Sequence, residues 1–109
     1  MMAKMETVVQ GSFEEILDRI EQGILRGSAT ASMEDQSDFV SGNCRCSVRV
    51  FERYSMLGSN RVSLNVTLFQ GPDGKIHLSA ITSGGSQAVF YKMNTFGEQA
   101  FLEKLEEIL

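Results

Sequence analysis

Three arginines recur at every fourth position of one stretch of the sequence, at Arg45, Arg49 and Arg53. Residues 44–54 alternate in polarity with the period of a β-strand, so the three guanidinium groups fall on one side of it. Guanidinium groups bind carboxylates and phosphates through paired N–H donors. The spacing predicts a basic stripe for a small anionic ligand or a partner protein. The alternative is a solvated face whose arginines pair with Asp or Glu.

We expect this stripe on the outward face of a sheet. Two later stretches also alternate, with their apolar positions inward and with Asn65 and His77 outward beside the arginines. Phe51 and Phe69 would give that face an apolar centre. Joint replacement of the three arginines would then leave folding intact but abolish an association. On this interpretation the inward side of residues 44–54 consists of Cys44, Cys46, Val48 and Val50.

Two thiols and one imidazole are the other side chains that could do chemistry. Cys44 and Cys46 share a predicted strand, and the single histidine, His77, is predicted on the opposite face. A structural zinc site needs four converging ligands, which these residues do not supply. Cysteines two residues apart on an extended strand lie at or beyond the limit for a disulfide. We therefore expect the cysteines in the apolar core and His77 on the surface.

A glycine-rich polar segment follows the last clear strand pattern. Residues 82–87 read Thr-Ser-Gly-Gly-Ser-Gln. Backbone N–H groups of such a segment can bind an anion, but it lacks the spacing and the lysine of a phosphate-binding loop. A hairpin turn and a ligand-contacting loop both fit it. The candidate ligand or partner surface thus comprises Arg45, Arg49, Arg53, Asn65, His77, Ser86 and Gln87.

Two amphipathic helices and four to six strands are predicted to position these residues. Ser12 with Glu15, and Thr95 with Glu98, have the spacing of capping boxes, and apolar residues recur at helical spacing after each. Residues 71–74 read Gly-Pro-Asp-Gly, a turn. We expect a loop at residues 34–43 and strands at residues 6–10, 28–33, 44–54, 61–69 and 75–82, with a further strand at 86–92 left open.

The economical packing of these elements is a two-layer α+β fold. Strands with one apolar face form a twisted antiparallel sheet, and both helices can cover that face. We expect a single domain, residues 1–109, with the order β-α-β-β-β-β-(β)-α. This order resembles the TATA-binding-protein-like topology and, more loosely, the helix-grip folds, in which a curved sheet grips a C-terminal helix.

Composition limits the location and the partners. The formal net charge of −4 argues against a nucleic-acid binder, which usually carries a basic face. No apolar run has the length of a membrane span, and the first residues lack the apolar segment of a secretory signal. Two cysteines make no disulfide framework. We therefore expect a cytoplasmic protein.

Several segments resemble a family of short bacterial proteins of unknown function. They read SATASMED, CSVRVFERY, NRVSLNVT, SAITSGGSQA and NTFGE, at residues 28–35, 46–54, 60–67, 79–88 and 94–98. The resemblance extends over nearly the whole chain. It implies a single domain in a bacterial cytoplasm, and it brings no activity, cofactor or catalytic residue.

Three classes of function are compatible with these patterns. The leading hypothesis is a non-enzymatic binding or interaction module that uses the polar, arginine-bearing sheet face to bind a second copy, another protein or a small anionic ligand. The alternative is a carrier that holds a small molecule between the sheet and the C-terminal helix. An enzyme is the least favoured class, because the sequence shows no nucleophile–base pair, metal cluster or cofactor motif.

Overall fold

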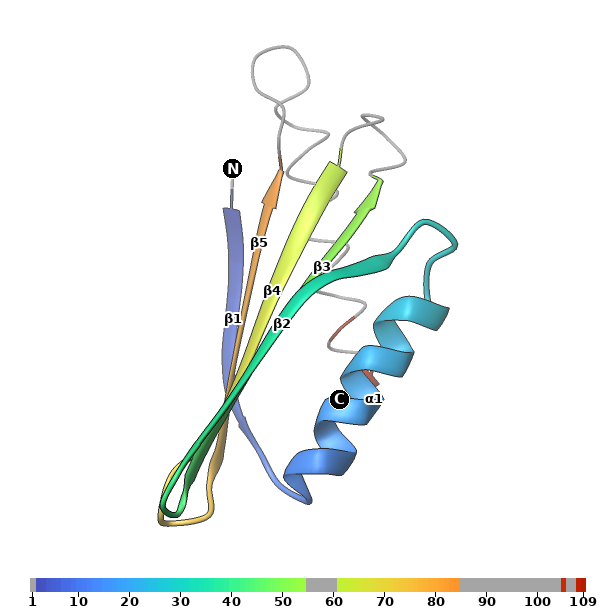
Figure 1. Cartoon of the computed structure of the whole chain (residues 1–109). Coiled ribbons are helices and arrows are strands. Elements are labelled where there is room, and N and C mark those ends of the chain that lie inside the picture. The colour runs from blue at the N-terminus through green and yellow to red at the C-terminus, as the bar shows by residue number, and fades with distance from the viewer. Residues whose placement is uncertain (1, 55–60, 85–104, 106–107) are drawn as a thin grey trace.

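The computed structural model of the chain describes residues 2–54, 61–84, 105, 108 and 109. Its five strands form one antiparallel sheet in the spatial order β1-β5-β4-β3-β2, and α1 packs across one face of that sheet (Figure 1). Among the described residues, no helix is both long and apolar enough to span a bilayer. The elements are β1 (Met2–Val9), α1 (Phe13–Arg26), β2 (Ser32–Ser41), β3 (Cys44–Tyr54), β4 (Arg61–Gln70) and β5 (Ile76–Gly84).

The α+β class and the antiparallel sheet are confirmed by this arrangement. The further strand at residues 86–92 lies outside the described residues. So does the second helix, apart from three positions near its end. One of these, Leu105, is fully buried and belongs to the same hydrophobic core as α1.

Helix α1 begins where the sequence predicts its cap. The Ser12 hydroxyl accepts a hydrogen bond from the Glu15 backbone N–H at 3.4 Å, which satisfies one of the free donors of the first turn. The apolar stripe of α1 faces the sheet and is buried. Its residues are Phe13, Ile16, Ile20 and Ile24.

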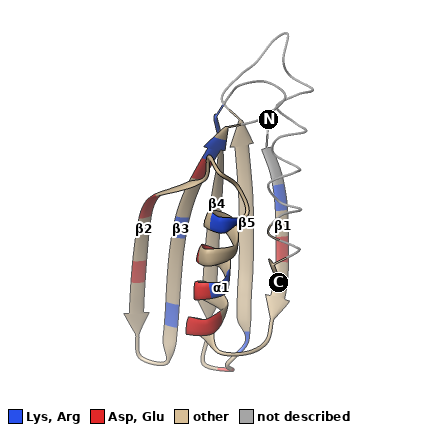
Figure 2. Cartoon of the chain, turned by 90° about the vertical axis from the view of Figure 1, so that its right-hand side faces the viewer, with Lys and Arg blue, Asp and Glu red and all other residues tan. Residues whose placement is uncertain are grey.

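The core lies between α1 and the central strands (Figure 2). Side chains of β4 and β5 alternate in burial, as expected for strands with one covered face. The turn between these strands is the predicted one, closed by a 3.1 Å hydrogen bond from the Gly74 N–H to the Gly71 carbonyl. The buried residues that β4 and β5 contribute are Val62, Leu64, Val66, Leu68, Ile76, Leu78 and Ala80.

The prediction of a loop at residues 34–43 is wrong, because β2 occupies most of this segment. β2 pairs antiparallel with β3, and Gly42 and Asn43 form the two-residue connection between them, with Gly42 at φ 56°. An edge strand tolerates polar residues on both faces. The acidic residues of this segment favour a loop in the sequence, but one of them, Asp38, binds side chains of β3. Asp38 accepts a 2.6 Å hydrogen bond from the Ser47 hydroxyl of β3. The register shifts once, between Met33 and Asp35, as at a β-bulge.

The predicted orientation of β3 is also wrong. Arg49 pairs with Val66 and Phe51 pairs with Leu64, and residues directly opposite in an antiparallel sheet point to the same face. Val66 and Leu64 lie in the core beneath α1. The side of β3 that carries Arg45, Arg49, Arg53 and the buried Phe51 therefore faces the helix, and Cys44, Cys46, Val48 and Val50 face away from it.

Acidic side chains on both neighbouring elements explain this orientation. Arg49, whose side chain is 7% exposed, donates to Glu21 of α1 at 2.6 Å and to Asp38 of β2 at 3.0 Å. Burial alone would lower the pKa of Arg49, but the hydrogen bonds to Glu21 and Asp38 outweigh burial and raise it. Figure 2 shows these charges as blue bands on β3 and red bands on β2 and α1. The charge of Arg49 is thus neutralised from within the chain.

Arg45 is the next arginine on the helix-facing side of β3, in the direction of the Gly42 turn. It pairs with Glu14 in the first turn of α1, and its guanidinium carbon lies 4.1 Å from the centre of the Phe13 ring. Such a cation–π contact adds to the ion pair. Glu14 and Glu21 are seven residues, or about two helical turns, apart, so both can reach arginines along one strand.

Gly23 lets the end of the chain approach α1 closely. A Cβ atom built on Gly23 would lie 2.5 Å from both Cδ1 and Cγ1 of Ile108. Ile108 packs against the core cluster. A glycine inside a helix costs about 1 kcal/mol relative to alanine, and here it provides the space for Ile108.

We expect Gly23→Ala to lower the free energy of unfolding by about 1 kcal/mol, since overpacking costs roughly 1–3 kcal/mol and exceeds the gain in helix propensity. In an Ile108→Ala background the same change should instead stabilise the protein, because the obstruction is gone. Urea unfolding of the four proteins of this cycle measures both effects. A stabilising Gly23→Ala in the wild-type chain would contradict the close contact.

Arg49→Met should lower the free energy of unfolding by about 1–3 kcal/mol, because it leaves Glu21 and Asp38 facing each other without their shared cation. The matched control is Arg61→Met, which removes an exposed arginine paired with Glu52 and should change stability by about 0.5 kcal/mol or less. Equal effects of the two replacements would show that Arg49 does not anchor α1 and β2.

Acid should weaken the folded state through two carboxyl groups. Hydrogen bonds from Ser47 and then Arg49 lower the pKa of Asp38, and the hydrogen bond from Arg45 lowers the pKa of Glu14. A group with a depressed pKa stabilises the fold above its unfolded-state value, here 3.8 for Asp and 4.5 for Glu, and this contribution is lost as the pH falls through the folded-state pKa.

The measurement is urea unfolding from neutral pH to about pH 3. We expect the free energy of unfolding of the wild-type chain to fall more steeply below about pH 4.5 than that of Asp38→Asn, which lacks one of these two carboxyl groups with a lowered pKa. Parallel profiles for the two proteins would refute the role of Asp38.

Candidate functional site

The structure divides the predicted surface between the two faces of the sheet. Arg45, Arg49 and Arg53 lie on the side of α1, whereas Asn65 and His77 lie on the opposite side, hereafter the open face. Burial lowers the pKa of Arg53, consistent with its position on the covered side. Ser86 and Gln87 lie outside the described residues. The prediction of one polar face that carries the three arginines together with Asn65 and His77 is therefore wrong.

A continuous row of side chains crosses the open face from one edge to the other. Each member is the direct pairing partner of the next, one from each strand, and adjacent Cβ atoms in such a row are about 4.5–5.5 Å apart. Most of the row is apolar or aromatic. In spatial order from β2 to β1 it consists of Phe39, Cys46, Phe69, His77 and Val8.

Large apolar side chains on this face are exposed to solvent. Phe39 is 63% and Phe69 43% exposed, and Val8 and Ile81 are exposed as well. Tyr54 adds an exposed aromatic ring at the far end of β3. Single exposed apolar residues are ordinary, but a contiguous row of them indicates a contact surface.

Charged side chains are confined to the rim of the open face. The nine central positions form three rows on β3, β4 and β5, and none of them is Lys, Arg, Asp or Glu. Charges occur on the edge strands, at Asp35 and at the ion pair of Lys4 with Glu6, and at one end, where Arg61 pairs with Glu52 and Glu34. The nine central residues are Cys46, Phe69, His77, Val48, Thr67, Ser79, Val50, Asn65 and Ile81.

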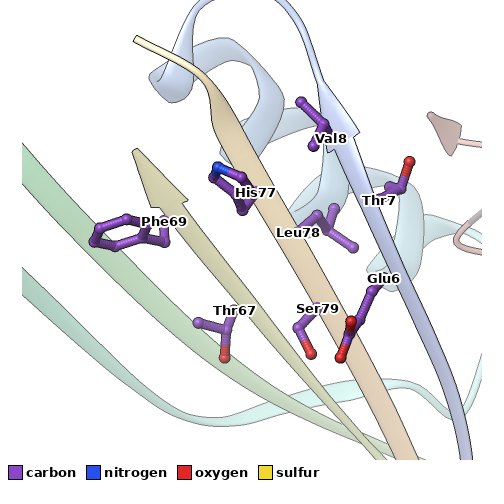
Figure 3. Close-up of a pocket in the computed structure, with 8 residues that line it drawn as sticks. All are labelled: Glu6, Thr7, Val8, Thr67, Phe69, His77, Leu78 and Ser79. Atoms are coloured by element: carbon purple, nitrogen blue, oxygen red, sulfur yellow. The ribbon is translucent and has the colours of Figure 1, made fainter. Parts of the chain in front are cut away.

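A hollow of about 350 Å³ lies on the β1 side of the open face (Figure 3). His77 and Phe69 lie side by side on its floor, with ring centres 6.3 Å apart and planes inclined by 41°. Among its lining side chains, those of Thr67, Ser79, Glu6 and Thr7 carry oxygen atoms, as Figure 3 shows. A hollow of this kind suits a side chain of a partner better than a reacting substrate, because it is shallow and open.

The thiols and the imidazole share a face, contrary to the sequence prediction. Cys46 and His77 belong to one row, but Phe69 stands between them, which puts them two strand spacings or about 10 Å apart. Within the described part of the chain, no three His, Cys, Asp or Glu side chains are placed to hold a metal ion. Cys44 and Cys46 are free thiols and are half-buried on the open face, so the prediction of core cysteines is wrong.

Hydrogen bonds on the open face join small polar groups to one another. The hydroxyl groups of Ser63 and Ser83 are 2.7 Å apart, and the Thr67 hydroxyl donates to the Asn65 amide oxygen at 3.2 Å. Such pairs hold side chains in place and leave lone pairs and amide protons for a further contact. The arrangement can bind a surface that is neutral, apolar and able to form hydrogen bonds.

Two signals in the sequence could have revealed the row. The acidic neighbours of Phe39 favour a loop, yet Ser37, Phe39 and Ser41 occupy every second position and would share one uncharged face of a strand. Phe51 within the arginine set was the second signal, since a large apolar residue is more often inward than outward.

Comparisons with solved structures show similarity of fold alone. A protein of unknown function from Pseudomonas aeruginosa is 8% identical, with a TM-score of 0.53 over 92% of this chain and 78% of that chain. An 18 kDa protein from Caulobacter crescentus is 6% identical, with a TM-score of 0.50 over 98% of this chain and 91% of that chain. No curated protein matches the sequence.

The resemblance to a family of short proteins without known function is confirmed by a match over residues 2–109. That match spans nearly every position of the 109-residue chain. The chain belongs to the Family of unknown function (DUF6054).

Proposed function

We propose that this protein is a non-enzymatic interaction module whose binding surface is the open face of the sheet. The observation that carries the proposal is the combination of a charge-free centre with an exposed apolar row. Centres of protein interfaces are depleted in Lys, Glu and Asp and enriched in aromatic residues, and their rims are polar. The open face has this distribution, with Phe69 on its middle strand and with Lys4, Glu6 and Asp35 on its edge strands.

A protein partner is better supported than a small anionic ligand. The arginines that suggested an anion point to the other side of the sheet, where Glu14, Glu21 and Asp38 neutralise two of them. On the open face the only arginine among the described residues is Arg61, and it pairs with Glu52. An anion bound at the centre of this face would find no cation to balance it.

The carrier alternative has weaker support. A ligand between the sheet and the C-terminal segment would need space on the side of α1. Leu105 is fully buried there, and Ile108 contacts Gly23 so closely that a methyl group would not fit. The described residues on that side are thus packed against one another.

Site-specific photocrosslinking in the cells that make the protein tests the proposed surface. A benzophenone side chain placed at position 69, in the exposed row on the middle strand of the open face, should yield a discrete crosslinked product that mass spectrometry can identify. The matched control is position 40, because Val40 is 76% exposed but lies on the side of α1. Absence of a product from position 69, or the same product from position 40, would contradict the proposal.

A further inference from the structure

We infer that the partner of the open face is a second copy of this chain, packed open face to open face about a two-fold axis. This inference rests on the proposed function. The assembly would be a sandwich of two five-stranded sheets with one α1 on each outer side. Three observations support a second copy over an unrelated protein: the balance of charge on the face, its area and the arrangement of its rim.

The charge balance of the open face suits contact with itself. Each copy carries a formal net charge of −4, so two copies repel unless their meeting surfaces are neutral. Lys4 pairs with Glu6, and Arg61 pairs with Glu52 and with Glu34. With Asp35 this leaves an excess of two carboxylates, all at the rim and none among the central residues. A two-fold contact brings a patch against its own copy, so the patch must complement itself. Hydroxyl and amide groups such as Ser79 and Asn65 do so, because each can both donate and accept.

The area of the face matches what a stable dimer needs. The five strands have eight to eleven residues each. With strands about 4.8 Å apart and a rise of about 3.3 Å per residue, the face measures roughly 24 by 30 Å, or about 700 Å². Specific interfaces bury about 800 Å² on each partner. A second sheet packed about 10 Å away would therefore cover the whole face and enclose the hollow beside His77.

The rim determines the orientation of the two copies. Asp35 on β2 and Lys4 on β1 belong to one row, at its two ends, because the pairing runs from Asp35 through Val50, Asn65 and Ile81 to Lys4. A two-fold axis parallel to β4 places β2 of one copy over β1 of the other. Asp35 then faces Lys4 of the second copy at both edges of the sandwich, and Phe39 faces Val8 of the second copy.

Light scattering coupled to size exclusion, with sedimentation equilibrium over a range of micromolar concentrations, tests the dimer on the full chain. We expect a dimer for the wild-type protein. Phe69→Lys should raise its dissociation constant by about 100-fold or more, since an axis parallel to β4 places position 69 of one copy against position 69 of the other, so two like charges meet in the contact. Val40→Lys, on the side of α1, should leave the dissociation constant unchanged. Circular dichroism confirms that both variants are folded.

Charge reversal at the rim provides a second test of the dimer if Phe69→Lys fails to fold. Asp35→Lys and Lys4→Asp should each weaken the dimer several-fold, and the two together should restore it. Absence of restoration would overturn the orientation. A wild-type protein that stays monomeric at every concentration, or a dimer that Val40→Lys disrupts and Phe69→Lys does not, would overturn self-association. A crosslink from position 69 to a different protein would then still support the proposed function.

Discussion

The ion pairs of Arg49 with Glu21 and Asp38 are the constraint on which the rest of the structure depends. Successive side chains of a strand point to opposite faces, so the choice of face for one residue decides it for all of them. With Arg49 held between α1 and β2, Phe51 enters the core and Val48 and Cys46 turn outward. The neutral centre of the open face is therefore a consequence of charges on the opposite side.

This constraint also explains why a buried arginine is tolerated beside an apolar core. Removing a guanidinium group from water is costly unless other groups replace its hydrogen bonds. Arg49 receives carboxylates from both sides and also donates to the carbonyls of Ser37 and Val48, at 3.4 and 3.0 Å. Its position is fixed by groups from a helix, a neighbouring strand and its own backbone, so it orients three elements relative to one another.

The parts of the fold that follow from local patterns could be predicted from the sequence. The cap at Ser12, the apolar stripe of α1, the alternation of β4 and the turn at Gly74 depend on residues a few positions apart. These signals also placed His77 and Asn65 outward, where the structure has them. The expected helix at residues 95–109 and the ligand loop with Ser86 and Gln87 stay predictions, because residues 85–104, 106 and 107 fall outside the described part of the chain.

The orientation of β3 could not be predicted in this way. Residues 44–54 offer two alternating sets, one with Cys46, Val48 and Val50 and one with Phe51 among arginines, and local hydrophobicity favours the first. The second set faces the core because Arg49 donates a hydrogen bond to Glu21 of α1. The two residues are 28 positions apart, so no local pattern in the sequence indicates this contact. The predicted binding surface is wrong for the same reason. It combines the arginines of β3, which face α1, with Asn65 and His77, which lie on the open face.

The β-bulge in β2 has a consequence for how copies of the chain can grow into larger assemblies. A regular edge strand can accept another strand, and repetition of that step leads to fibres. In β2 the shift between Met33 and Asp35 interrupts the regular spacing of backbone donors and acceptors, and acidic side chains flank it. Addition of a further strand at this edge is therefore disfavoured, which protects the sheet against open-ended polymerisation through β2.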